Sequence, residues 1–177
     1  MNRDGWEGRT TGVAKRVAYS AMLTALAMIF SYIETLIPLS VGIPGIKLGL
    51  ANLVVLLGFY FLKPMQVAEV SVLRIVLTAA LFGNVASLAY SLAGGILSFL
   101  VMLLLCKRCR GFSPVGVSAA GGVSHNIGQL LAAVCIVGSA SVLYYLPILM
   151  LAGLAAGVLI GVVGTYVRKH LERFIVS

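Results

Sequence analysis

The chain has 177 residues, of which 60% are hydrophobic and 10% are charged. Its mean hydropathy of +1.07 lies far above that of soluble domains, which excludes a soluble enzyme or a soluble binding module. The formal net charge of +8 would suit nucleic acid, but the basic residues lie at the ends of apolar stretches, as in membrane proteins. The composition therefore predicts an all-α integral membrane protein with a single bundle of transmembrane helices.

Five apolar stretches are long enough to cross a bilayer, for which about 20 residues are required, and a sixth is shorter. The long stretches cover residues 17–37, 65–82, 86–106, 115–137 and 143–167. The short stretch, 48–62, rises only about 22 Å as a helix, so either the preceding loop extends it or it enters the membrane partway. We predict a six-helix membrane domain over residues 17–167, with tails at 1–16 and 168–177.

The placement of lysine and arginine predicts the orientation of these helices. If all six stretches cross the membrane, eleven basic residues fall on one side. They are Arg3, Arg9, Lys15, Arg16, Lys63, Lys107, Arg108, Arg110, Arg168, Lys169 and Arg173. Because basic loops remain in the cytoplasm, both termini are predicted to be cytoplasmic. The first stretch is longer than the apolar core of a signal peptide, so we expect it to remain as an anchor.

The connection 38–47 is rich in proline and glycine, which permit tight turns. It is interpreted either as a lid over an external opening or as a plain loop. Pro44 and Lys47 would lie at the rim together with Glu34, and Lys47 and Glu34 alternatively form an ion pair there.

Cys106 and Cys109 form a CxxC pattern beside a predicted helix end. A zinc site requires about four ligands, so these cysteines are predicted to be ordinary reduced thiols. We predict no metal and no cofactor.

Small residues recur at helical spacing in two stretches. Gly153, Gly157 and Gly161 follow one another at four-residue steps, a pattern that brings membrane helices close together. They are predicted to pack inside the bundle. Ala21 and Ala25 belong to an alanine face of the first stretch, which either packs internally or docks another membrane subunit.

Two paired glycines, Gly94-Gly95 and Gly121-Gly122, lie within apolar stretches. They allow either a kink or a close approach of the backbone to a neighbour.

Arg74 is the most unusual residue of the apolar stretches, because a guanidinium always keeps its charge. It shares a helical face with Ser71 and Thr78 and lies about eight residues into its stretch. An ionised group at this depth requires a partner. The alternatives are an ion pair with Glu34 or Glu69, or an anionic ligand.

A second polar group lies at comparable depth in the segment 124–129, where His125 and Gln129 share a helical face and Asn126 points about 100° away. These residues either form hydrogen bonds between helices or orient a ligand. Asn52, Asn84 and Tyr90 lie toward the predicted outer side. Together with Arg74 they predict a cavity that opens outward, since binding pockets combine apolar walls with a few convergent polar groups.

Sequence motifs that are typical of several classes of enzyme are missing. The sequence contains one aspartate, Asp4, so an aspartate-rich magnesium cluster for diphosphate chemistry cannot be built. The phosphate-binding pattern GxxxxGK[ST] does not occur either. We predict no catalytic residues and no enzymatic activity.

Several strings together resemble the Gx transporter family, also described as heptaprenyl diphosphate synthase component I. They are the segments 43–52, 74–75, 82–84, 90–95 and 125–129, and the resemblance covers about residues 14–167. This family is in turn similar to the substrate-binding S components of energy-coupling factor (ECF) transporters, although that likeness is more remote.

The resemblance implies a small protein of a bacterial inner membrane that captures a vitamin-like or precursor molecule from outside the cell. A transmembrane scaffold subunit and two ATPase subunits would then power its release. Ala21 and Ala25 match the AxxxA motif with which S components dock the scaffold, and the loop around Pro44 matches their substrate-covering loop. The competing implication is a non-catalytic subunit associated with a prenyl diphosphate synthase or a redox complex.

Overall fold

The computed structural model describes residues 13–36, 50–108 and 112–176, which fold entirely into helices and short connections. The elements are α1 (Val13–Leu36), α2 (Leu50–Phe61), α3 (Pro64–Phe82), α4 (Val85–Arg108), α5 (Pro114–Val137), the short 3-10 helix η2 (Ala140–Tyr145) and α6 (Leu146–Val176). The predicted rim residues Pro44 and Lys47, and also Cys109, lie outside the described residues.

Among the described residues, five helices are long and apolar enough to cross a membrane, so the protein is a multi-pass membrane protein. They agree with the five long stretches predicted from the sequence. Helix α1 begins four residues before the predicted boundary at residue 17, and α6 continues through most of the predicted tail. At 12 residues, α2 rises only about 18 Å, so this helix alone is too short to cross a hydrocarbon core of about 30 Å.

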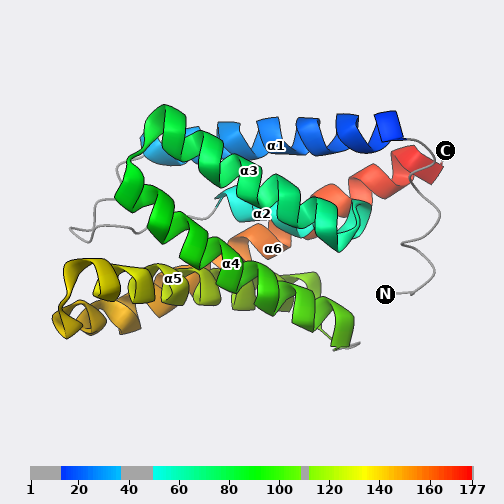
Figure 1. Cartoon of the computed structure of the whole chain (residues 1–177). Helices are drawn as coiled ribbons and strands as arrows, with labels where there is room; N and C mark the ends of the chain where they lie inside the picture. Colours follow the sequence, from blue (N-terminus) through cyan, green and yellow to red (C-terminus); the bar gives the residue numbers. More distant parts are fainter. Residues whose placement is uncertain (1–12, 37–49, 109–111, 177) are drawn as a thin grey trace.

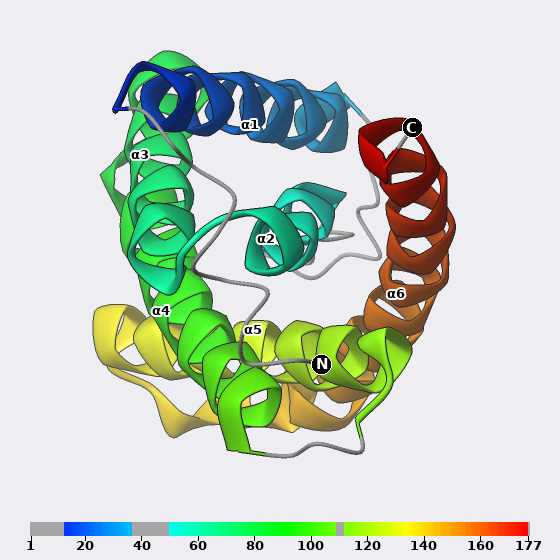
Figure 2. The same ribbon diagram turned by 90° about the vertical axis from the view of Figure 1, so that its right-hand side faces the viewer.

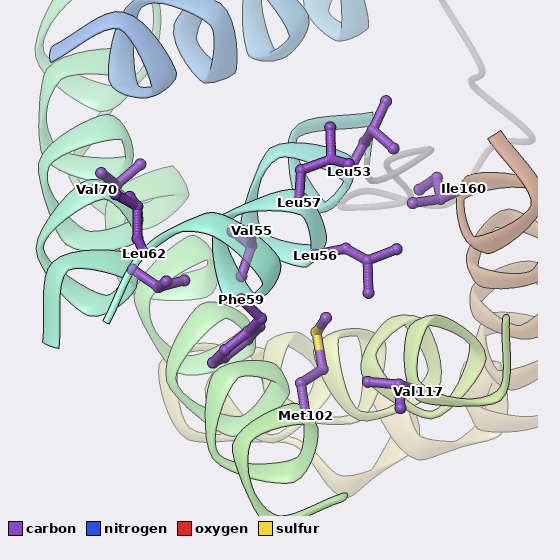
Figure 3. Packing of buried hydrophobic residues seen from close by; sticks show 11 residues of the cluster. Leu53, Val55, Leu56, Leu57, Phe59, Leu62, Val70, Met102, Val117 and Ile160 are labelled. Carbon is purple, nitrogen blue, oxygen red and sulfur yellow. The ribbon is translucent and has the colours of Figure 1, made fainter. Parts of the chain in front are cut away.

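Helix α2 occupies the centre of the molecule. Figure 2 shows α1, α3, α4, α5 and α6 arranged as a ring around it, and all residues from 51 to 59 are buried. This position explains why α2 has no polar face and carries Asn52 as its one amide side chain, because a helix that is enclosed on every side leaves little room for polar residues. The central packing involves Leu56 and Phe59 of α2, Met102 of α4 and Ile160 of α6 (Figure 3).

Successive helices run in alternating directions (Figure 1), and the connections between α2 and α3 and between α3 and α4 contain only two residues each. Pro64 and Pro114 occupy the first turns of α3 and α5, where a missing N–H leaves no hydrogen bond unmade. Gly138, with a φ of 68°, ends α5 in the left-handed conformation that favours glycine.

The molecule therefore has two distinct ends (Figure 1). At the Glu34 end, α1 and α3 finish and α4 and α6 begin. At the Lys63 end, α2 passes into α3 and α4 finishes, and the side chains of Lys63, Lys107 and Lys169 are exposed there. These three lysines thus lie at one end, as the charge pattern predicts. Which end faces the cytoplasm remains a prediction.

Glycines allow α5 to approach both of its neighbours closely. A Cβ added to Gly157 would lie 2.6 Å from the carbonyl oxygen of Ser118, and the Gly122 position faces the carbonyl oxygen of Gly153. The predicted packing of the α6 glycines inside the bundle is thereby confirmed. Against α4, a Cβ at Gly94 would lie 2.7 Å from the carbonyl oxygen of His125. Gly94 therefore serves close helix approach, one of the two predicted uses.

Candidate ligand-binding site

A cavity of about 50 Å³ lies among five helices near the Glu34 end. Most of its lining residues are polar, although the surrounding helices are apolar. The lining consists of Ser31, Glu34, Asn52, Arg74, Ile75, Thr78, Ala79, Phe82, Gly83, Ser87, Ser91 and His125. The structure thus brings together four of the predicted residues, Glu34, Asn52, Arg74 and His125.

Arg74 forms the deepest charged part of this lining, with only 7% of its surface exposed. It lies inside the bundle because Val67, Val70, Ser71, Arg74 and Ile75 are the buried positions of α3 and recur at helical spacing. Placement of the guanidinium thus follows from the apolar pattern of the helix that carries it.

The two terminal nitrogens of Arg74 make long contacts with neutral groups. Nη1 donates to Ser31 Oγ at 3.4 Å, and Nη2 donates to Asn52 Oδ1 at 3.4 Å. Hydrogen bonds of this kind are usually 2.7–3.2 Å long, so both contacts are weak. The guanidinium is held in position by α1 and α2 without strong pairing to either acceptor.

Two buried donor atoms of the lining have no hydrogen-bond partner within the described part of the chain. They are Nε of Arg74 and Oγ1 of Thr78. The residues are four apart on α3, so their side chains share a face. An unmade hydrogen bond of a buried donor is unfavourable by about 1–3 kcal/mol. A ligand atom that accepts hydrogen bonds would remove this penalty.

Glu34 supplies the negative charge of the cavity. Its Oε1 accepts a hydrogen bond of 2.6 Å from the backbone N–H of Leu50, the first residue of α2. A carboxylate is stabilised at a helix N-terminus by the helix dipole. Glu34 also interacts electrostatically with Arg74. By contrast, Glu69, the other predicted partner of Arg74, is exposed on α3.

The polar residues of α5 point toward three different neighbours. His125, which is 7% exposed, lines the cavity. The Nδ2 of Asn126 donates to the carbonyl oxygen of Leu149 in α6 at 2.7 Å. Gln129 is buried where α5 crosses α4, with its Cγ close to Gly94. The interhelical hydrogen bond foreseen as one alternative therefore exists for Asn126.

Residues 23–167 match the protein family described as heptaprenyl diphosphate synthase component I. The chain belongs to this family. No curated protein and no solved structure matches the chain.

The family match covers every residue of the cavity lining, from Ser31 to His125. It begins between Ala21 and Ala25, the two residues predicted to dock a partner. Both alanines are exposed on α1, so this pair does not serve internal packing in the described part of the chain. That this face docks another membrane subunit remains a prediction.

Asn84 and Tyr90 were also predicted to bind the substrate, but neither residue lines the cavity. Asn84 is exposed, and its Oδ1 accepts a hydrogen bond of 2.8 Å from the backbone N–H of Ser87. This geometry is that of a helix N-cap at the start of α4. Tyr90 is half-buried on α4, and its neighbour Ser91 lines the cavity instead.

Ser31 lines the cavity, although the sequence analysis did not predict it as a site residue. It belongs to the buried face of α1, together with Thr24 and Ala27. These residues are small or polar and recur at helical spacing, whereas the exposed face carries larger residues such as Met22 and Ile29. This spacing of small and polar residues could have predicted the buried face of α1, but the alanines on the other face of the helix form a more obvious pattern.

Proposed function

We propose that this protein is the substrate-binding S component of an ECF-type transporter. It captures a small anionic molecule from outside the cell, either a vitamin-like compound or an isoprenoid or quinone precursor, at the Arg74 cavity. The observation that carries the proposal is the buried guanidinium of Arg74, which lies in a polar cavity lined by five helices and whose Nε–H has no hydrogen-bond partner among the described residues. Partner subunits supply the energy for uptake.

The energetic argument for a ligand starts from Arg74. An arginine near the middle of a membrane helix costs at least about 2.5–3.5 kcal/mol by insertion scales. The two long contacts to Ser31 and Asn52 offset little of that cost, because net hydrogen-bond energies in membranes average about 0.6 kcal/mol. The electrostatic attraction of Glu34 offsets a further part of it. Such an arginine is retained when it has a role besides stability, and binding a polar ligand is the role that its surroundings support.

The size of the cavity limits which part of a ligand it holds. Pockets that enclose a whole drug-sized molecule have volumes of about 300–1,000 Å³, whereas this one has about 50 Å³. A single functional group fits beside Arg74. The rest of a vitamin-sized ligand would extend toward the Glu34 end or require the helices around the cavity to separate.

The partners follow from the exposed alanine pair on α1. In our proposal the Glu34 end faces outward, and the flat surface around Ala21 and Ala25 contacts a transmembrane scaffold that binds two ATPase subunits. Small residues allow helices to approach closely in lipid. Ala21→Trp should therefore block this contact.

The test is co-purification of the tagged chain, in mild detergent, with ATP-hydrolysing subunits. Ala21→Trp should abolish their recovery without lowering the amount of bound small molecule. The matched control is Ala155→Trp, which adds the same bulk at an exposed position of α6. Equal recovery of the ATPase subunits with both variants would contradict the docking surface.

The description of the matching family also suggests a second candidate function, which is a non-catalytic membrane subunit of a prenyl diphosphate synthase. It predicts that a soluble synthase co-purifies with the chain. It also predicts that the purified complex elongates prenyl diphosphates and carries no tightly bound small molecule. The same purification therefore separates the two candidates.

A further inference from the structure

We infer that the anionic group of the ligand is a carboxylate, which binds to the Nε–H of Arg74 and to the hydroxyl of Thr78. This inference rests on the proposed function, because it assumes that the cavity binds an anionic molecule. It goes further in two respects, since it names the chemical group and adds Thr78 to the residues that bind it.

Two buried donors on one face of α3 determine where this group would lie. Arg74 and Thr78 both line the cavity, and neither Nε of Arg74 nor Oγ1 of Thr78 has a hydrogen-bond partner among the described residues. Thr78 lies about one helical turn beyond Arg74, toward the Glu34 end of α3. The Nε–H of an arginine can only donate. One acceptor group placed between the two atoms would complete both hydrogen bonds.

The shape of the guanidinium favours a carboxylate as that acceptor group. A guanidinium is planar, and its Nε–H points in the same direction as one N–H of a terminal nitrogen. Both terminal nitrogens make only long contacts, of 3.4 Å, to Ser31 and Asn52, so neither is strongly engaged. A carboxylate offers two oxygens to such a pair of donors, and these charge-assisted hydrogen bonds are short and strong. The Thr78 hydroxyl would donate to one of the same oxygens.

The size of the cavity agrees with a carboxylate and disagrees with a diphosphate. The cavity has a volume of about 50 Å³. One water molecule requires about 10–15 Å³, so roughly four groups of that size fit. A carbon atom and its two oxygens occupy less than this space, whereas two linked phosphates exceed it. Prenyl diphosphates are therefore expected not to place their diphosphate group at Arg74.

The order of residues along α3 gives the bound molecule a direction. Arg74, Thr78 and Phe82 follow one another at four-residue steps in the lining and thus share a face. Phe82 is the last residue of the helix, at the Glu34 end. Ile75 and Ala79 line the cavity between them, and apolar neighbours strengthen hydrogen bonds by lowering the local dielectric constant. The carboxylate would therefore lie deepest, and the rest of the molecule would extend past Phe82.

The decisive variant is Thr78→Val, which removes the hydroxyl and keeps a branched side chain of nearly the same volume. The measurement compares how much of the compound recovered from wild-type protein stays on each variant, per folded chain, after identical washing in mild detergent. Thr78→Val should retain at least about tenfold less, because it lacks one hydrogen bond to a charged group. Thr78→Ser keeps a hydroxyl and should retain nearly the wild-type amount.

Thr165→Val is the matched control for this variant. The Thr165 hydroxyl donates to the carbonyl oxygen of Gly161 at 2.7 Å and does not line the cavity. Its loss should leave the retained amount unchanged. If Thr78→Val also retains the wild-type amount, then water or an acceptor outside the described residues satisfies Thr78. That result would overturn the inference.

Arg74→Lys examines the shape of the guanidinium separately from its charge. Lysine keeps the positive charge but lacks the planar pair of donors. The retained amount should again fall at least about tenfold, because the hydrogen bond from Nε–H is lost. Wild-type retention by Arg74→Lys would overturn the inference. If Arg74→Leu loses the compound in the same experiment, the proposed function stands nevertheless.

The chemistry of the compound provides a measurement that does not depend on how the variants fold. The compound is recognised by its presence on wild-type protein and its loss from Arg74→Leu. After treatment with acidic methanol, its mass should increase by that of a methyl ester. A compound that forms no methyl ester has no carboxyl group, and this result would overturn the inference alone. Failure to find any Arg74-dependent compound would contradict the proposed function, and the inference with it.

Discussion

Gly94 couples the packing of α4 against α5 to the shape of the cavity. A Cβ added there would lie 2.7 Å from the carbonyl oxygen of His125, about 0.7 Å short of the 3.4 Å at which ordinary contacts begin. The obstructing atom belongs to the backbone, so it cannot turn away as a side chain could. Gly94→Ala should therefore push α5 away from α4 and displace His125, which lines the cavity.

The expected change in stability combines two opposing effects. Overpacking of this kind costs about 1–3 kcal/mol, and alanine regains about 1 kcal/mol over glycine as a helix former. The net destabilisation is then about 1 kcal/mol, or about 2–4 °C in Tm for a chain of this length. Bound small molecule per folded chain should fall severalfold at the same time, because His125 has moved.

Gly157→Ala is the matched comparison for this prediction. Its added Cβ would lie 2.6 Å from the carbonyl oxygen of Ser118, a similar backbone clash where α5 meets α6, and neither residue lines the cavity. It should lower the Tm as much as Gly94→Ala does and leave ligand occupancy unchanged. Thermal unfolding in detergent and mass spectrometry of the bound molecule measure the two effects. A higher Tm for Gly94→Ala, or equal loss of ligand in both variants, would refute the reasoning.

Other contacts give further expectations. Phe59→Ala, in the enclosed helix α2, should destabilise the protein by about 3–5 kcal/mol, whereas Leu151→Ala, on an exposed face of α6, should change stability by less than about 0.5 kcal/mol. Similar effects of the two changes on thermal unfolding would argue against a central α2. Asn126→Leu removes the hydrogen bond to Leu149 and should cost about 1 kcal/mol. Its ligand occupancy should match that of the wild type, and loss of ligand would assign Asn126 to the binding site.

The apolar pattern predicts the helices well, because each long helix requires a continuous run of residues that lipid tolerates. The place of α2 could not be predicted in this way. Its sequence from Leu50 to Phe61 has no polar face, so it reads equally as a short membrane span and as an enclosed helix. Only the contacts with the surrounding helices decide between these possibilities.

The site was predictable where a polar residue lies on the buried face of its own helix. Arg74 and His125 satisfy this condition and meet at one cavity. Asn126 is buried as well, but its direction about the axis of α5 brings it to α6, and the neighbours of a helix cannot be read from a single sequence. Asn84 stands before α4, where the same amide group serves equally as a cap and as a ligand contact.

The central claim is that Arg74 holds a small molecule, and the most direct test is to measure that molecule on the purified protein. Wild-type protein should carry about one equivalent of a single compound, and Arg74→Leu should carry none while remaining monodisperse. Arg168→Leu is the control, since this arginine lies over the ring of Tyr60, far from the cavity lining, at the Lys63 end. It should keep the compound. Equal occupancy in wild-type and Arg74→Leu protein would contradict the account.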